Sequence, residues 1–135
     1  MRRKVFVSMM GGIGDQIFQF GFAYFLKKKL NCDAYLDISY YENKKNYNKF
    51  RFRLTNLSKK NKFVIKKNIF KLNYQYISYL RILSKLKLDI LFPSIYNLFF
   101  KYNFKKFIYE YWKDKKKYKI KQNSYYFGYW HNLKY

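Results

Sequence analysis

The sequence predicts an α/β fold in which helices flank a parallel β-sheet. Three observations in the first forty residues predict it: a short apolar run that ends at glycines, a helical pattern after those glycines, and a second short apolar run. A strand, a glycine turn, a helix and a strand within about 35 residues form a βαβ unit. Such a unit makes its two strands parallel and joins them by a right-handed crossover.

The elements of this unit are delimited by changes in the residue pattern. The first strand is predicted over Lys4–Met10, because an uninterrupted apolar run there is typical of a buried strand. A helix is predicted from Asp15 to about Leu30, with Asp15 at its N-cap or first turn. The second strand is predicted over Ala34–Ile38. The apolar positions that recur at helical spacing are Ile17, Phe18, Gly21, Phe22, Phe25 and Leu26.

The rest of the chain carries weaker patterns. The spacing predicts a short extended piece over Lys49–Leu57, a helix over Tyr74–Leu88 and a β-prone aromatic segment over Tyr125–Trp130. A second helical pattern follows Pro93, and the lysine-rich run Lys113–Lys117 is expected to be a solvated loop. We expect both helical stripes of this region to face a core. Their apolar positions are Ile77, Leu80, Leu83 and Leu86, then Ile95, Leu98, Phe99 and Tyr102.

Composition excludes several classes of protein. The chain has 135 residues, which indicates one domain or part of one, and 25% of them are aromatic, which excludes a disordered basic tail. A single cysteine excludes a disulfide framework. Cys32 and His131 cannot supply three protein ligands for zinc, so no metal site is predicted.

The chain is strongly basic, with 30 Lys and Arg against 7 Asp and Glu and a net charge of +23. Its abundant Lys, Asn, Ile, Phe and Tyr are also the residues whose codons are rich in A and T, so genome composition explains much of the charge. Nucleic acid and anionic lipid headgroups are the alternative explanations. No apolar stretch is long enough for a signal peptide or a spanning helix, so a cytoplasmic location is expected.

The glycine turn between the first strand and the helix is the candidate site. Gly11, Gly12 and Gly14 allow a close backbone approach, and the first amides of the helix point toward whatever lies above the turn. The spacing matches neither the dinucleotide fingerprint nor the P-loop. It indicates an anion or sugar-nucleotide site, whereas a tight strand-to-helix connection without a ligand is the alternative.

Four blocks of the sequence resemble the bacterial α-1,2-fucosyltransferases of glycosyltransferase family 11. The turn Gly-Gly-Ile-Gly-Asp-Gln and the helix after it resemble that family's N-terminal signature. The other blocks are Cys32–Glu42, similar to the family's "LD-S-[WY]-[FY]", Phe50–Leu54, similar to "R-x-[FY]-x-L", and Tyr126–Tyr135, similar to "G-Y-[WF]-Q-x-x-x-Y". The blocks occur in the family's order and reach both ends of the chain.

The resemblance implies a glycosyltransferase of the GT-B type, with two Rossmann-like domains facing a cleft. It implies inverting, metal-independent transfer of fucose from GDP-fucose to the 2-hydroxyl of a galactoside during surface-glycan synthesis, such as that of lipopolysaccharide O-antigen. No cofactor is implied, because GDP-fucose is a substrate. The residues that would line the donor cleft are Gly11, Gly12, Gly14, Asp15 and Gln16.

Three departures from the family pattern shape these expectations. Asp15 replaces an Asn, so its carboxylate would either face the donor phosphates or cap the helix. His131 replaces a Gln. The motif H-x-R-x-G-D, whose Arg neutralises the leaving pyrophosphate, does not occur in the sequence. Residues 1–135 are therefore expected to be a truncated, acceptor-side N-terminal domain without its nucleotide-binding domain, inactive alone.

Two further possibilities follow from the charge and the aromatic residues. The alternative function is a basic, aromatic-rich protein that binds single-stranded nucleic acid by stacking and lysine contacts. A peripheral position on the inner face of the membrane is compatible with the transferase hypothesis, because a basic surface is attracted to anionic lipids. The expected partners are a sugar nucleotide, a galactoside-containing glycan and a second chain that carries the missing half.

Overall fold

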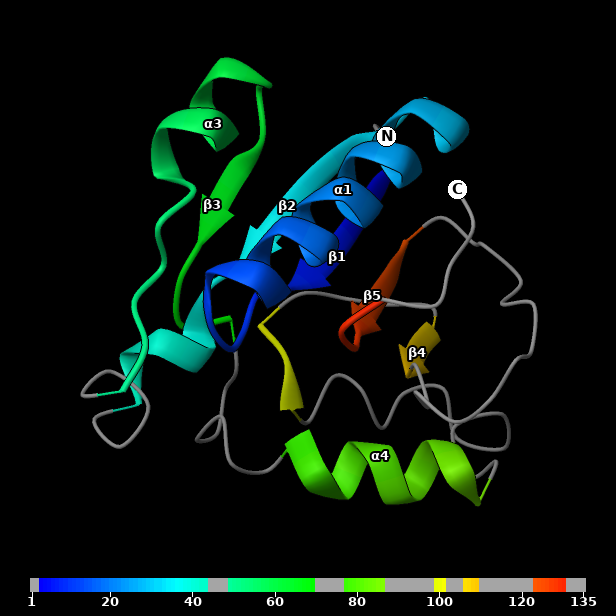
Figure 1. Ribbon diagram of the computed structural model, residues 1–135. Helices are drawn as coiled ribbons and strands as arrows, with labels where there is room; N and C mark the ends of the chain where they lie inside the picture. The colour runs from blue at the N-terminus through cyan, green and yellow to red at the C-terminus, as the bar shows by residue number, and fades with distance from the viewer. Residues whose placement is uncertain are drawn as a thin grey trace.

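The computed structural model describes residues 3–43, 49–69, 77–86, 99–101, 106–109 and 123–130 (Figure 1). These residues form an α/β fold, as the sequence predicts. Its elements in chain order are β1 (Lys4–Ser8), α1 (Ile13–Leu30), β2 (Asp33–Asp37), the 3-10 helix η1 (Ser39–Glu42), α3 (Thr55–Lys60), β3 (Val64–Lys66), α4 (Ile77–Lys85), β4 (Lys106–Tyr109) and β5 (Ser124–Phe127).

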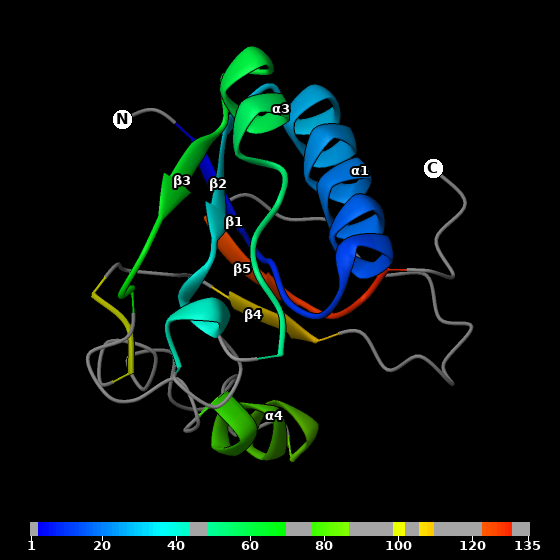
Figure 2. The ribbon, with the colours of Figure 1, turned by 60° about the vertical axis from the view of Figure 1, so that its left-hand side comes forward.

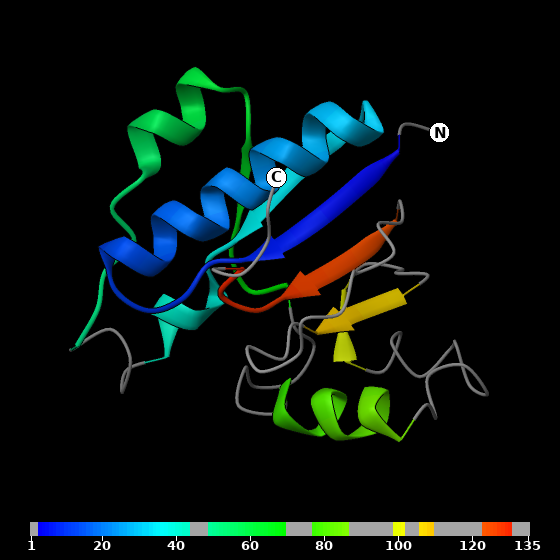
Figure 3. The ribbon, with the colours of Figure 1, turned by 45° about the vertical axis from the view of Figure 1, so that its right-hand side comes forward.

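The strands form one five-stranded sheet in the order β3-β2-β1-β5-β4. Every neighbouring pair in this sheet is parallel. α1 and α3 lie on one face of the sheet, and α4 lies on the other (Figures 2 and 3). The predicted parallel sheet flanked by helices is therefore confirmed.

The central strand β1 supplies side chains to both faces of the sheet. Val5, Val7 and Met9 enter the core beneath α1, and Phe6 and Met10 enter the core on the α4 side. Successive side chains of a strand point to opposite faces, and both faces of β1 are covered. This double burial explains why the strand is an unbroken apolar run instead of an alternating one.

The predicted βαβ unit is confirmed, with small shifts in its boundaries. β1 and β2 are parallel neighbours, and Lys4 lies opposite Asp33 in their register. α1 begins at Ile13, two residues before the predicted start, because Gly12 is its N-cap and the Gly12 carbonyl accepts the Gln16 amide at 3.1 Å. The helix ends at Leu30, as predicted, and its C-cap Asn31 has the left-handed conformation with φ of 44°.

The extended piece predicted over Lys49–Leu57 is only partly correct. Thr55–Lys60 form α3, which was not predicted from the sequence. The helix begins here because the Leu54 carbonyl accepts both the backbone amide and the hydroxyl of Ser58. The residues before Thr55 have no strand partner among the described residues, and the Gln16 side chain bonds their backbone instead. A helix therefore replaces the last part of the predicted extended piece, and a side chain binds the backbone of the part before it.

The remaining elements were predicted unevenly. α4 lies within the helix predicted over Tyr74–Leu88, and β5 overlaps the predicted aromatic segment. β3 and β4 were not predicted, because three- and four-residue strands are too short to show a period. Lys113–Lys117 and most of the second helical stripe lie outside the described residues.

The exposed sides of the two longer helices carry unexpected apolar residues. In α1, Gln16 and Gln19 are buried, while Ile17 and Phe18 are 57% and 45% exposed. In α4, Leu83 packs against a core as expected, but Leu86, directly after the helix, is 61% exposed, so the expectation for Leu86 was wrong. No helix in the described part of the chain is long and apolar enough to cross a membrane.

Candidate functional site

The glycine turn lies at the carboxyl end of β1, the central strand of the sheet. β2 lies on one side of β1 and β5 on the other. The chain proceeds from β1 outward to β2 and β3, and then reaches β4 and β5 on the opposite side of β1. In open parallel sheets, such a reversal of strand order opens a crevice at the carboxyl ends of the strands, where ligands bind.

Gly11 is required by the shape of the turn. Its φ is +75°, and a methyl group at this position would clash with the Asp15 carboxylate. Its carbonyl oxygen accepts a hydrogen bond from the Tyr41 hydroxyl at 3.1 Å. The positive φ and the contact with Asp15 explain why glycine occupies this position.

Asp15 caps the helix from within its first turn. Its Oδ2 accepts the backbone N–H of Gly12 at 3.1 Å, which is one half of a capping box. The carboxylate also lies near the positive end of the helix dipole. Of the two roles considered for Asp15, the structure therefore describes the capping role.

Gln16 lies beneath the turn and is fully buried. Its Nε2 donates to the carbonyls of Gly11 and Arg51 at 3.3 and 2.8 Å, and its Oε1 accepts the Arg53 amide at 2.9 Å. Both ends of the amide are therefore occupied. Gln16 holds the segment around residue 52 against the turn instead of facing the space above it.

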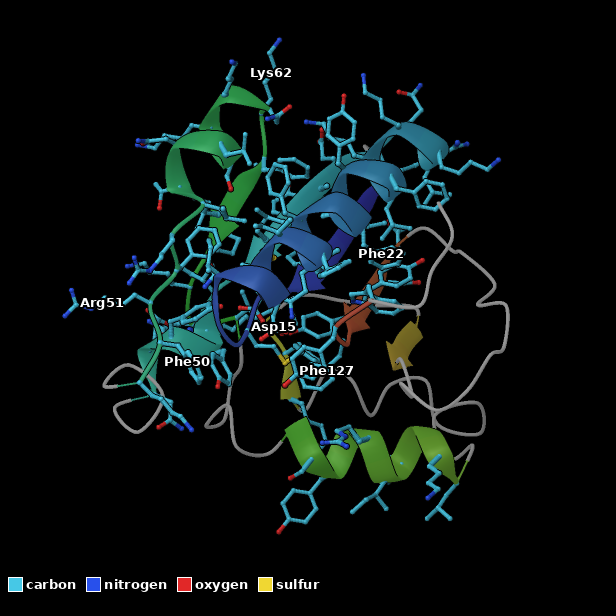
Figure 4. All side chains as sticks on the ribbon, viewed as in Figure 1. Asp15, Phe22, Phe50, Arg51, Lys62 and Phe127 are labelled. Atoms are coloured by element: carbon cyan, nitrogen blue, oxygen red, sulfur yellow. The ribbon has the colours of Figure 1, made fainter. Side chains whose placement is uncertain are left out.

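The open side of the turn is formed by Gly12 and Gly14. A methyl group added to Gly12 would lie 3.8 Å from the Phe50 ring, which lies beside the turn (Figure 4). A methyl group added to Gly14 would meet nothing within 4 Å. Gly14 and the side chain of Ile13 are exposed, so the first turn of α1 is accessible from outside.

Gln19, which the sequence analysis did not select, joins the turn to the end of β5. Its Oε1 accepts the Met10 amide at 2.8 Å, and its Nε2 donates to the Gly128 carbonyl at 3.3 Å. Gln19 is fully buried. A polar residue within an otherwise apolar stretch of helix was the available signal, since a buried amide needs partners.

Three tyrosines surround the turn. Burial raises the pKa of Tyr40 and of Tyr129, and the nearby Asp15 carboxylate raises both further. Burial also raises the pKa of Tyr41, with smaller contributions from Tyr40 and Asp15. The Arg81 guanidinium acts on the pKa of Tyr129 in the opposite direction, with the smallest contribution.

Asp37 is a second polar centre that the sequence analysis did not select. It ends β2 and is fully buried, and its Oδ1 accepts the amide and the hydroxyl of Ser39 at 2.9 and 2.6 Å. Its Oδ2 accepts the Tyr125 hydroxyl at 2.6 Å. Burial raises its pKa to about 6, and the three hydrogen bonds oppose this rise. A carboxylate directly after a buried strand was the signal.

The hydroxyl of Ser8 adjoins this centre. Ser8 lies opposite Asp37 in the parallel register and is fully buried. Its Oγ has no hydrogen-bond partner among the described residues. A buried hydroxyl therefore lies beside the buried Asp37 at the carboxyl end of the central strands.

The described residues contain neither a candidate metal site nor a reactive thiol. They contain no group of three metal-ligating side chains, and His131 lies outside them. Burial raises the pKa of Cys32 to about 11, so this thiol is a poor nucleophile at neutral pH. Cys32 instead lines a hollow of about 250 Å³ at the far end of α1, away from the glycine turn, together with Lys27, Lys28, Asn31 and Asp33.

The candidate site therefore brings together all four sequence blocks. The glycine turn accepts the Tyr41 hydroxyl, Gln16 binds the backbone at Arg51 and Arg53, and Gln19 binds the Gly128 carbonyl. Comparison with known proteins found no matching family model, no matching curated protein and no matching solved structure.

Proposed function

We propose that this chain is a sugar-handling domain of a glycosyltransferase resembling the family 11 α-1,2-fucosyltransferases. In this proposal, the α/β fold is the Rossmann-like, acceptor-side half of a GT-B enzyme that transfers fucose from GDP-fucose to a galactoside 2-hydroxyl. The observation that carries it is the convergence of the four family-like blocks on one turn. These blocks lie far apart in the sequence, yet buried amide side chains and a tyrosine hydroxyl join three of them to the turn.

The surroundings of the turn are suited to a polar ligand with apolar faces. Small-molecule sites typically combine aromatic walls with a few placed polar groups. Here Phe50 lies beside Gly12, and Tyr129, which is 42% exposed, lies within electrostatic reach of Asp15. The first turn of α1 supplies backbone N–H donors, and Gly14 leaves the space beside them open.

Binding is the appropriate readout for this chain. Transfer from GDP-fucose places developing negative charge on the leaving pyrophosphate, which needs a positioned cation. The H-x-R-x-G-D motif that supplies this cation in the family does not occur in the sequence. We therefore propose that the chain binds the galactoside and approaches the donor, while efficient transfer needs an arginine placed as in that motif.

The test compares two substitutions on the same helix. Gly14→Leu fills the open space at the turn, and Gly21→Leu makes the same change two helical turns away, where a methyl group also meets nothing within 4 Å. We expect wild type and Gly21→Leu to bind lactose and GDP-fucose equally in ligand-observed NMR. Gly14→Leu should weaken binding about tenfold or more, because its side chain occupies the ligand's space.

Two outcomes would contradict the proposal. One is that folded wild-type protein binds neither lactose nor GDP-fucose, and the other is that Gly14→Leu binds like wild type. A preference for single-stranded DNA over polyphosphate at raised salt, unchanged by Gly14→Leu, would instead favour the nucleic-acid alternative.

We also propose that the protein works in the cytoplasm, at the inner face of the membrane. Its net charge of +23 favours contact with anionic lipid headgroups. The buried free thiol of Cys32 is compatible with a reducing compartment.

A further inference from the structure

The outer side of α4 carries a stripe of exposed apolar side chains. Tyr79, Ile82 and Leu86 are 55%, 55% and 61% exposed, and they follow one another at steps of three and four residues. That spacing places them on one side of a helix. Leu83, four residues after Tyr79, is partly buried and packs against the core on the α4 side of the sheet, so the exposed stripe adjoins the buried side of α4.

The helix carries positive charge and no negative charge. Arg81 and Lys85 belong to the same helix, and residues 77–86 contain no Asp or Glu. Several side chains of α4 point away from the sheet (Figure 4). A helix that combines an exposed apolar stripe with flanking cations is typical of helices that lie in a membrane interface.

The charge of the whole chain selects the kind of partner. At +23, the protein repels basic surfaces and a second copy of itself, and it attracts anionic surfaces over about 10 Å at 0.1 M salt. A bilayer with anionic phospholipids is complementary to both the charge and the apolar stripe. Its headgroups meet the cations, and its acyl boundary accepts the apolar side chains.

We propose that α4 is a membrane-docking surface for bilayers that contain anionic phospholipids. Tyr79, Ile82 and Leu86 enter the boundary between headgroups and acyl chains, while Lys85, three residues after Ile82, contacts the phosphates.

This inference rests on the peripheral location proposed above and names the surface responsible. It is tested without any sugar, so its failure is distinguishable from a failure of the transferase proposal. A protein that binds lactose but not vesicles would retain the proposed function and overturn the docking surface.

The experiment is vesicle flotation of the full chain with two double variants of unchanged charge. Ile82→Gln/Leu86→Gln removes two side chains of the α4 stripe. Ile17→Gln/Phe18→Gln is the matched control, because these residues are 57% and 45% exposed on α1, on the opposite face of the sheet. Vesicles of phosphatidylcholine alone are compared with equimolar phosphatidylcholine and phosphatidylglycerol, and circular dichroism checks that each variant is folded.

We expect wild type and the α1 variant to float with the anionic vesicles and not with the neutral ones. The affinity of the α4 variant for the anionic vesicles should be lower by at least about tenfold, because two apolar side chains no longer enter the bilayer. Equal binding of all three proteins would overturn the proposal, since charge alone would then explain the attraction. Loss of binding in the α1 variant alone would overturn it as well, as would a lipid-free dimer that only the α4 variant dissociates.

Discussion

Gly11 and Gly14 belong to the same turn, but the backbone requires a glycine only at Gly11. Gly11 has a φ of +75° and faces the Asp15 carboxylate, whereas Gly14 lies in the first turn of α1 beside open space. Both glycines could be located from the sequence as parts of one motif. The φ angle and the position of Asp15 decide which of the two must be glycine. Neither can be predicted from the spacing of the glycines in the sequence.

Alanine substitutions should separate these two glycines. Gly11→Ala should lower the free energy of unfolding by about 1–3 kcal/mol, because the new methyl group meets Asp15 and the left-handed conformation is strained. Gly14→Ala should leave it unchanged or raise it by up to about 1 kcal/mol, since alanine favours the helix. Urea unfolding measures both, and an equal loss in the two variants would contradict this account.

At the scale of the elements, two buried glutamines on α1 organise the site. Gln16 and Gln19 lie three residues apart and are buried, and each joins α1 to a segment that is distant in the chain. The helix itself was predicted from its apolar spacing. The partners of the two amides could not be predicted, because they lie 35 and 109 residues away in the chain.

Hydrogen exchange should show that the two glutamines hold different segments. Gln16→Leu removes the acceptor of the Arg53 amide, and Gln19→Leu removes the acceptor of the Met10 amide. Each variant should speed exchange of its own amide about tenfold or more, because an unbonded amide loses roughly 1–3 kcal/mol of protection. Each variant is the control for the other, and identical exchange patterns would show that the effect is only global.

At the scale of the whole molecule, contacts between distant strands hold the sheet together. The order of the strands places β5 between β1 and β4, so the last described strand completes the centre of the sheet. The Tyr125 hydroxyl on β5 donates to the buried Asp37 on β2, across the central strand β1. This bond joins residues 88 positions apart, and the stability of the whole sheet depends on the protonation state of Asp37.

The pH dependence of stability should report the burial of Asp37. Its folded pKa of about 6 exceeds the ordinary value of 3.8, so the protonated form favours the folded state. This stabilisation is complete below pH 3.8 and is lost as the pH rises through 6, a change of about 3 kcal/mol. Asp37→Asn cannot ionise and should remove that decline in urea unfolding between pH 4 and 7. A decline of the same size in the variant would show that another group causes it.

The sequence by itself determined the βαβ unit, the glycine turn and the strongly basic surface. Each of these follows from a simple feature of the sequence: an apolar run, a change from strand to helix periodicity, or the number of charged residues. Only the tertiary structure decided which distant segments meet at the turn, why Gln16 is buried beneath it, and which side of α4 is exposed. These features depend on the order and packing of parallel strands, which bring together residues that no local periodicity relates.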